Sequence, residues 1–278
     1  MKKLLAVVLT LSLLTLLLVG CGPKEEKKVV VAAKPFTEGY VVAEMIALIV
    51  ENHTEIDVER RCDIVGDATI IHQGLLDGEI DMYGEYTSTA WFYLIKQEEV
   101  IADHDVLFEK LKAEYEKLGL VWMDLYGFNN TYALTIRKDT QAEYGITNTS
   151  DLIAVADQLS LGANFDYYER EDGYEALKEA YNFEGFGETV EVNIGLRYQA
   201  LAEGEVDVIN GFTTDGLIEA YDLVPLEDDL SFFKAYYAST VVRAETLEKY
   251  PELEAALDML SGTMTDAELT GLNYLVDG

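Results

Sequence analysis

The chain has 278 residues, of which 49% are hydrophobic, and 52 acidic side chains against 20 basic ones give it a net charge of −32 at pH 7. The acid is spread along the whole length, which excludes nucleic acid as a partner because phosphate backbones require basic surfaces.

The N-terminus has the layout of a secretory signal peptide: two lysines, an apolar run from Leu4 to Val19, and then Gly20 and Cys21. Residues 18–21 read Leu-Val-Gly-Cys and resemble the lipobox of bacterial lipoproteins, which implies lipidation of Cys21. The alternative is an uncleaved membrane helix, but roughly 16 apolar residues are few for a ~30 Å hydrocarbon core. We therefore expect an extracytoplasmic chain, lipid-anchored to the cell membrane, with a signal peptide over residues 1–21 and a tether over 22–28.

Cys62 is the one cysteine that remains after this segment. A single thiol cannot form an internal disulfide or a multi-cysteine metal site, so no metal is expected and Cys62 is predicted to be a small buried hydrophobe. No later stretch approaches 18 uninterrupted apolar residues, so any transmembrane partner would be a separate chain.

Strand-like and helical patterns alternate along the remaining roughly 250 residues, which predicts α/β architecture in two lobes. Residues 28–34 are expected to form a strand buried on both faces of a parallel sheet. Thr37 would cap the following helix, which would present Val41, Met45 and Ile49 on one face. The further expected elements are a helix over 67–76, a strand over 80–83, and a helix marked by Leu107, Leu111 and Tyr115 that ends near Gly119.

One pattern occurs twice. Residues 75–82 (LLDGEIDM) and 201–208 (LAEGEVDV) share a helix end, a Gly-Glu turn and a short buried strand, 126 residues apart. When the two repeats are aligned in this register, Tyr86 corresponds to Phe212. In open α/β sheets ligands sit beyond the carboxyl ends of parallel strands, so these two aromatics are expected to face one site from two lobes.

Seven segments in register then carry a resemblance that spans about residues 29 to 278. They are Lys34-Pro35-Phe36-Thr37-Glu38, Gly78-Glu79-Ile80-Asp81, Glu85-Tyr86-Thr87-Ser88-Thr89-Ala90, Gly127-Phe128-Asn129-Asn130-Thr131-Tyr132-Ala133-Leu134, Glu169-Arg170-Glu171-Asp172-Gly173, Thr214-Asp215-Gly216 and Leu226-Glu227-Asp228-Asp229. Together they resemble the glycine betaine, carnitine and choline binding proteins of osmoprotectant ABC importers.

The resemblance implies a type II periplasmic-binding-protein fold: two α/β lobes, a ligand cleft and two hinge crossings. The first lobe would hold residues 29–131 plus 237–278, and the second would hold residues 132–236.

The resemblance also implies an aromatic cage for a trimethylammonium group, which cannot donate a conventional hydrogen bond and is held by the faces of aromatic rings. It places Tyr86, Tyr132 and Tyr236 at cage positions, with an oxygen from Asn130. Phe212 stands where relatives often have another tyrosine. Tyr237 is adjacent to Tyr236, so a slip of one residue would exchange the two.

Lys34 and Arg170 match the family positions that bind the betaine carboxylate, and Thr89 would add a hydroxyl. Choline would leave these two cations unpaired, so the sequence predicts a preference for zwitterions over choline.

The function implied is that of the solute-binding lipoprotein of an ABC importer, which captures a glycine betaine-like solute and delivers it to a permease with its ATPase. The alternative within the same fold is binding of choline, carnitine or a non-methylated amino-acid-like solute. Enzymes are disfavoured, because His53, His72 and His104 lie in no nucleophile, metal or cofactor motif, and no cofactor is expected. A surface adhesin or a sensor-bound receptor remains a third class.

Overall fold

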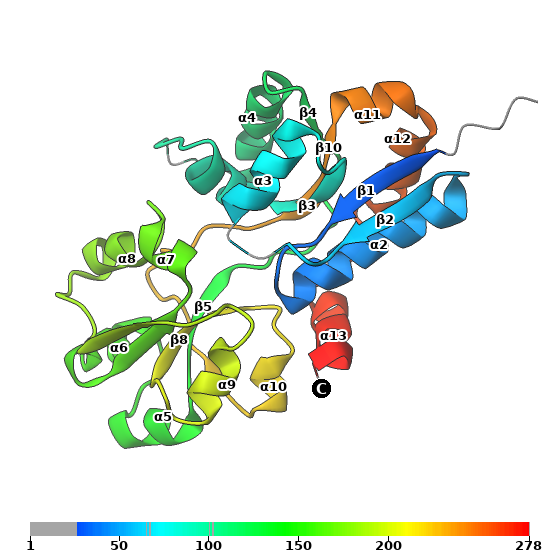
Figure 1. Cartoon of the computed structure of the whole chain (residues 1–278). Coiled ribbons are helices and arrows are strands. Elements are labelled where there is room, and N and C mark those ends of the chain that lie inside the picture. Colours follow the sequence, from blue (N-terminus) through cyan, green and yellow to red (C-terminus); the bar gives the residue numbers. More distant parts are fainter. Residues whose placement is uncertain (1–26, 65, 67, 100, 102, 278) are drawn as a thin grey trace, which may run out of the picture.

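The computed structural model describes residues 27–277 except 65, 67, 100 and 102; the predicted signal peptide, Cys21 and most of the tether lie outside this part. Two five-stranded sheets lie in separate halves of the molecule, and helices cover each of them (Figure 1). The predicted fold, two α/β lobes with a cavity between them and two crossings, is confirmed.

The first sheet has the strand order β2-β1-β3-β10-β4. β1 is parallel to both neighbours, and β10 runs antiparallel to β3 and β4. The strands are β1 (Lys28–Ala32), β2 (Asp57–Arg61), β3 (Met82–Tyr86), β4 (Leu120–Trp122) and β10 (Ala238–Arg243). The helices around it are α2 (Thr37–His53), α3 (Ala68–Asp77), the π-helix η1 (Thr89–Leu94), α4 (His104–Glu116), α11 (Ala244–Lys249), α12 (Glu252–Leu257), η3 (Asp258–Leu260) and α13 (Asp266–Asp277).

The second sheet repeats this arrangement with the order β7-β6-β8-β5-β9. Here β6 is the strand parallel to both neighbours, and β5 is antiparallel to β8 and β9. The strands are β5 (Tyr132–Ile136), β6 (Ser160–Ala163), β7 (Glu188–Glu191), β8 (Val208–Phe212) and β9 (Val224–Pro225). Its helices are α5 (Lys138–Tyr144), α6 (Thr149–Ile153), η2 (Ala156–Gln158), α7 (Phe165–Glu169), α8 (Tyr174–Tyr181), α9 (Arg197–Ala202) and α10 (Leu217–Ala220).

The repeated sequence pattern forms the same turn in both lobes. Gly78 after α3 and Gly204 after α9 each have φ of 76°, a left-handed conformation that glycine adopts without steric cost. The aspartates that follow hold the neighbouring strand, because Asp81 accepts from Val30 N at 2.7 Å and Asp207 accepts from Ser160 N at 3.0 Å. The next strands, β3 and β8, end at Tyr86 and Phe212, so the repeat aims one aromatic residue from each lobe at the junction.

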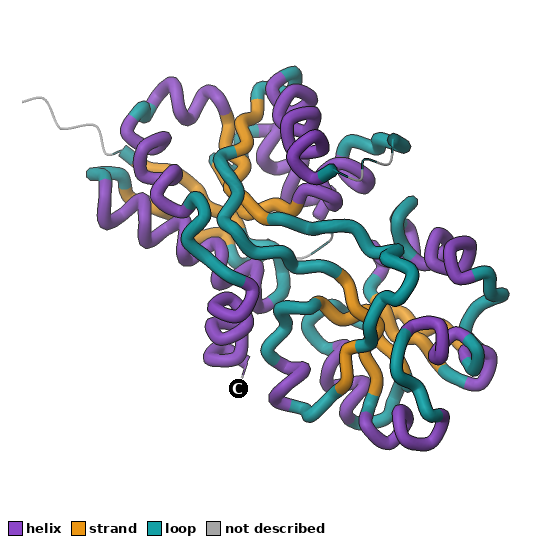
Figure 2. Tube along the Cα trace, turned by 180° about the vertical axis from the view of Figure 1, so that it is seen from behind, coloured by secondary structure: helices purple, strands orange, loops and turns teal. Residues whose placement is uncertain are grey.

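Two segments cross between the lobes: residues 123–131 from β4 to β5, and residues 226–237 from β9 to β10. Viewed from behind, they are loops that run between the two groups of strands (Figure 2). Backbone hydrogen bonds join them, since Asn130 N donates to Tyr236 O at 3.1 Å. The two crossings are therefore hydrogen-bonded to each other between the lobes.

The C-terminal helix α13 also touches both lobes. It lies beside α2 of the first lobe and packs against α10 of the second (Figure 1). The approach to α10 is close enough to require glycine, because a Cβ on Gly216 would lie 2.4 Å from the backbone nitrogen of Tyr274.

Three expectations about individual residues are wrong. Phe36 is the N-cap of α2, and the Thr37 hydroxyl donates to Asp277 instead of capping the helix. The buried face of α2 is displaced by one residue, with Val42, Ile46 and Val50 in the core and Val41, Met45 and Ile49 only partly buried. Cys62 is exposed, because it follows β2 at the edge of the first sheet, where no further strand covers it.

Candidate ligand-binding site

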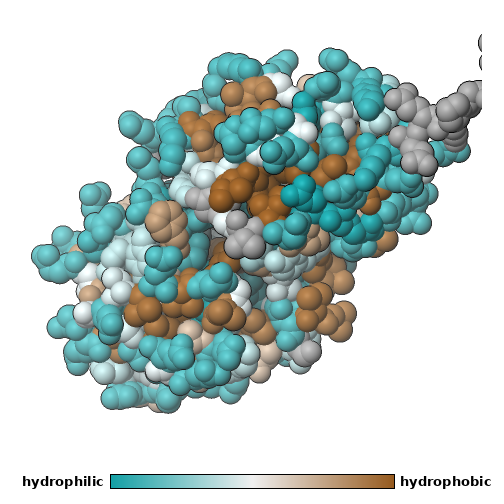
Figure 3. Space-filling model, in the orientation of Figure 1, coloured by the Kyte–Doolittle hydropathy of each residue, from teal (hydrophilic) through white to brown (hydrophobic). Residues whose placement is uncertain are grey.

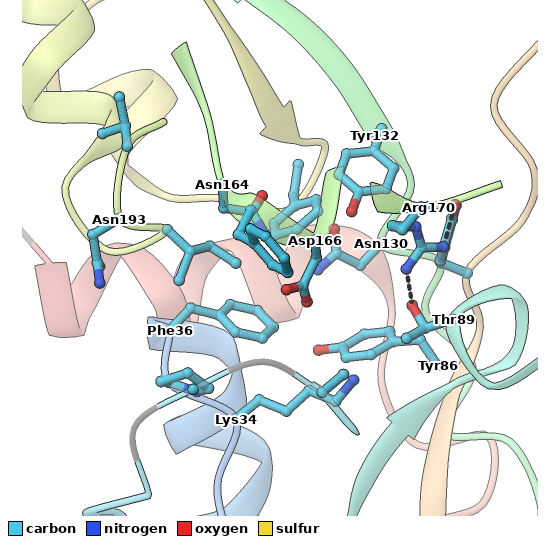
Figure 4. Close-up of a pocket in the computed structure, with 18 of the residues that line it drawn as sticks. Lys34, Phe36, Tyr86, Thr89, Asn130, Tyr132, Asn164, Asp166, Arg170 and Asn193 are labelled. Carbon is cyan, nitrogen blue, oxygen red and sulfur yellow. Dashed lines mark hydrogen bonds between the residues drawn. The ribbon is translucent and has the colours of Figure 1, made fainter. Parts of the chain in front are cut away.

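A cavity of about 400 Å³ lies between the lobes and is lined by side chains from both. All eight residues that the sequence singled out for ligand binding line it: Lys34, Tyr86, Thr89, Asn130, Tyr132, Arg170, Phe212 and Tyr236. Figure 4 shows the side chains of Lys34, Tyr86, Thr89, Asn130, Tyr132 and Arg170 around this space. The face shown in Figure 3 is mainly hydrophilic, with apolar patches in both halves of the molecule.

Five aromatic rings form a continuous chain around the cavity. Phe36 stands between the two lobes, with its ring centre 6.3 Å from that of Tyr86 and 5.7 Å from that of Phe212. Tyr132 continues the chain, at 4.9 Å from Phe212 and 5.4 Å from Tyr236. Tyr132 and Phe212 are direct partners in the β5–β8 ladder, so the antiparallel register fixes their contact.

The structure separates Tyr236 from its neighbour Tyr237. Tyr236 is buried and lines the cavity, whereas the ring of Tyr237 packs on His104 with 4.8 Å between their centres. Burial raises the pKa of Tyr236 well above its usual value, so its hydroxyl stays protonated and donates to Asp172 at 2.7 Å.

Lys34 follows β1 and reaches the cavity with its charge already paired. Its ammonium group forms a buried ion pair with Glu85 on β3, and the hydroxyl of Tyr83 donates to the same carboxylate at 2.8 Å. Tyr83 and Glu85 are two residues apart on one strand, so they point to the same side of the sheet. The Lys34 ammonium also lies 5.2 Å from the centre of the Tyr86 ring.

Arg170 closes the cavity at the end of α7, and its side chain is 2% exposed. Its Nε and Nη2 donate to the two carboxylate oxygens of Asp172 at 2.8 and 2.7 Å. Nη1 donates to Thr89 Oγ1 of the first lobe at 3.2 Å, and Nη2 also reaches the Tyr236 hydroxyl at 3.1 Å. Arg170 therefore bridges the two lobes across the cavity.

The prediction that choline would leave two cations unpaired is wrong. Lys34 has Glu85 and Arg170 has Asp172, so neither cation depends on a ligand carboxylate for charge balance. The Lys34–Glu85 pair forms through the tertiary arrangement of β1 and β3, and the Arg170–Asp172 pair through the fold of the loop after α7.

Several lining residues were missed. The second lobe adds Asn164, Phe165, Asp166, Asn193 and Ile194, which extend the cavity beyond the five rings. Phe36 was within reach of sequence reasoning, since it lies in the same motif as Lys34. Asn164 and Asn193 follow β6 and β7, and the carboxyl ends of those parallel strands were the available signal.

Asn130 brings an acceptor to the cavity from the first crossing. Its side chain is 4% exposed, and its Nδ2 donates to Glu38 at 2.7 Å. Its Oδ1 is buried and has no hydrogen-bond partner among the described residues.

Within the described ranges, no group of three or more His, Cys, Asp or Glu side chains is arranged to hold a metal ion. Among the helices of the same part of the chain, none combines the length and apolar character that crossing a membrane requires.

A cavity between two α/β lobes, lined by aromatic rings and by paired charges, is the site of a solute-binding protein with the type II periplasmic-binding-protein fold. More narrowly, residues 27–278 match the family of substrate binding domains of ABC-type glycine betaine transport systems, and the chain belongs to that family.

Its relatives differ in the solutes for which they are named. The chain is 40% identical over 254 residues to the ergothioneine transport permease/ergothioneine binding protein EgtU of Helicobacter pylori (strain G27), covering 91% of this chain but only 45% of that relative's length. It is 34% identical over 261 residues to the carnitine transport binding protein OpuCC of Listeria monocytogenes, covering 93% of this chain and 84% of the relative. A crystal structure of a glycine betaine/carnitine/choline ABC transporter protein superposes with a TM-score of 0.69 at 33% identity, over 90% of this chain and 92% of that chain.

Proposed function

We propose that the chain captures a trimethylammonium solute of the glycine betaine type in the cavity between its lobes and delivers it to an ABC permease with its ATPase. The observation that carries this proposal is the chain of five rings around one cavity, with Lys34 and Arg170 at its edge. In the same proposal, Cys21 carries the lipid that holds the chain at the outer face of the cell membrane.

The rings would hold the methylated nitrogen. Three to five ring faces at roughly 1 kcal/mol each supply about 3 to 5 kcal/mol, whereas micromolar binding needs about 8 kcal/mol. A second anchor is required, and we assign it to Arg170, Thr89 and Lys34, which line the same cavity and would bind a ligand carboxylate. The chemistry is capture without turnover, so no catalytic group is assigned.

A larger betaine is the second candidate. The cavity continues past the rings toward Asn164, Asp166 and Asn193, which is more space than glycine betaine fills. Polar side chains at that end favour a ligand with a hydrogen-bonding group beyond its trimethylammonium centre, such as carnitine or ergothioneine. Relatives named for these two solutes are 34% and 40% identical to this chain.

The test is a calorimetric and thermal-shift panel on the purified soluble part of the chain. Glycine betaine, carnitine, choline and ergothioneine form one set, and glycine and proline, which lack N-methyl groups, form the other. Binding raises the unfolding temperature by mass action, so at least one methylated compound should stabilise the protein and the unmethylated ones should not. Stabilisation by glycine or proline alone would contradict the proposal.

A further inference from the structure

Glu38 is a fully buried carboxylate behind the cavity wall. It lies in the first turn of α2, and neither of its oxygens reaches solvent. The hydroxyl of Tyr86 and the amide of Asn130 donate to Oε1 at 2.6 and 2.7 Å. The hydroxyl of Thr214 and the amide of Asn273 donate to Oε2 at 2.5 and 3.0 Å.

These four donors come from four separate parts of the fold. Tyr86 ends β3 in the first lobe, Asn130 lies on the first crossing, Thr214 follows β8 in the second lobe, and Asn273 is on α13. Two of them, Tyr86 and Asn130, also line the cavity. One carboxylate therefore fixes two cavity walls and ties them to the second lobe.

Charge sets Glu38 apart from the other buried acids. In the part of the chain that the structure describes, the buried carboxylates are Glu38, Glu85 and Asp215. Glu85 is paired with Lys34 and Asp215 with Arg197, whereas all four partners of Glu38 are neutral. An ionised Glu38 is thus a surplus negative charge one hydrogen bond behind the ring of Tyr86.

We propose that Glu38 is a positioning and specificity-determining residue of the ligand site, which holds Tyr86 and Asn130 in place and supplies the negative charge that balances a cationic head group. This inference rests on the proposed function. A phenol that donates to a carboxylate carries a more electron-rich ring, so the Tyr86 face attracts a quaternary nitrogen more strongly. The same charge favours holding the cationic end of a betaine against the rings, with its carboxylate toward Lys34 and Arg170.

The protonation of Glu38 is then coupled to binding. Burial raises its pKa to about 7, the hydrogen bonds from Thr214 and Tyr86 oppose this shift, and the charge of Asp215 adds to it. The other charged groups of the surrounding elements are held by partners: Lys34 by Glu85, Asp215 by Arg197, and Asp277 of α13 by the hydroxyl of Thr37. A bound cation lowers the pKa of Glu38, so binding near pH 6.5 releases a proton.

The experiment is titration calorimetry with glycine betaine and choline at pH 6 and 8, in two buffers of different ionisation enthalpy. For the wild type we expect proton release at pH 6 and about ten-fold tighter binding at pH 8, because a group with a pKa near 7 must lose its proton first. E38Q should bind more weakly at pH 8, without proton release and without pH dependence. E44Q, an exposed acid on the same helix, is the matched control and should behave as the wild type.

The outcomes separate the two proposals. If the wild type binds neither of these compounds and no other methylated member of the panel, the proposed function fails, and this inference fails with it. If the wild type binds without proton release, or E38Q keeps the pH dependence, the role of Glu38 alone is overturned. Should E38Q not fold, Y86F removes one donor from the carboxylate and must shift the pH midpoint of binding upward; an unchanged midpoint overturns the inference.

Discussion

Arg170 meets Asp172 through two hydrogen bonds of 2.8 and 2.7 Å, so the guanidinium that faces the cavity carries its own counter-ion. The pair lies in a loop directly after α7, with one residue between its members. A ligand carboxylate at this position would share Arg170 with Asp172. The affinity for a betaine therefore depends on the pair as a unit.

Removal of Arg170 and removal of Asp172 should shift the preference between glycine betaine and choline in opposite directions. R170Q should weaken glycine betaine by ten-fold or more, since a charge-assisted hydrogen bond contributes about 1.5 to 3 kcal/mol, while choline changes less. D172N leaves the guanidinium without its partner and should shift the ratio of affinities toward glycine betaine. Calorimetry with both ligands gives the ratio, and equal losses for the two ligands in R170Q would contradict a carboxylate anchor.

Tyr236 and Tyr237 provide a matched pair on adjacent positions. Y236A removes a ring from the cavity wall and should weaken trimethylammonium binding by about ten-fold, because one cation–π contact is lost together with its packing. Y237A removes a ring that packs on His104 instead, so it should leave the dissociation constant within about two-fold of the wild type. A larger effect of Y237A than of Y236A would show that the site lies elsewhere.

Phe36 tests the aromatic character of the wall apart from its volume. F36L keeps an apolar side chain of similar bulk between Tyr86 and Phe212 but removes the π face. We expect weaker binding of the methylated cation by about five-fold and little change in unfolding temperature, since volume-conserving swaps are well tolerated. Equal affinity in F36L and wild type would remove Phe36 from the cage.

Glu38 should also give the ligand-free protein a characteristic pH dependence. Its pKa rises from an ordinary value of 4.5 to about 7 on folding. The folded state therefore holds the proton more tightly than the unfolded chain. The contribution of Glu38 to the free energy of unfolding is largest below pH 4.5 and falls as the pH rises toward 7. Relative to E38Q, the free energy of unfolding of the wild type should fall by about 3 kcal/mol as the pH rises from 4.5 to 7.

Chemical denaturation of both proteins between pH 5 and 8 measures this difference. Other groups, including the buried His72, contribute equally to both proteins and cancel in the comparison. E44Q should track the wild type at every pH. A constant difference between wild type and E38Q would show that Glu38 does not change its proton occupancy on folding.

Local patterns were sufficient to predict much of the framework. The buried run that became β1, the helices α3 and α4, and the Gly-Glu turns at Gly78 and Gly204 follow from short-range chemistry, which the sequence displays directly. The strand ends after those turns carry Tyr86 and Phe212, so the position of the cavity also followed. Which of Tyr236 and Tyr237 lines the cavity depends only on the register of the second crossing.

Long-range partners were beyond the reach of the sequence. Glu38 looks like an ordinary helix-start acid until α13, 235 residues later, brings Asn273 onto it. The pairing of Lys34 with Glu85 spans 51 residues and depends on the parallel alignment of β1 and β3. The prediction that Cys62 is buried was wrong, because the exposure of this residue depends on which strand forms the edge of the sheet.

The most direct test of the central claim compares glycine betaine with 3,3-dimethylbutanoate, which has the same shape and carboxylate but a carbon in place of the charged nitrogen. If ring faces hold a methylated cation, calorimetry should show glycine betaine binding at least ten-fold more tightly. Equal or tighter binding of the carbon analogue would show that the rings form an ordinary apolar wall, and the account of this site would be wrong.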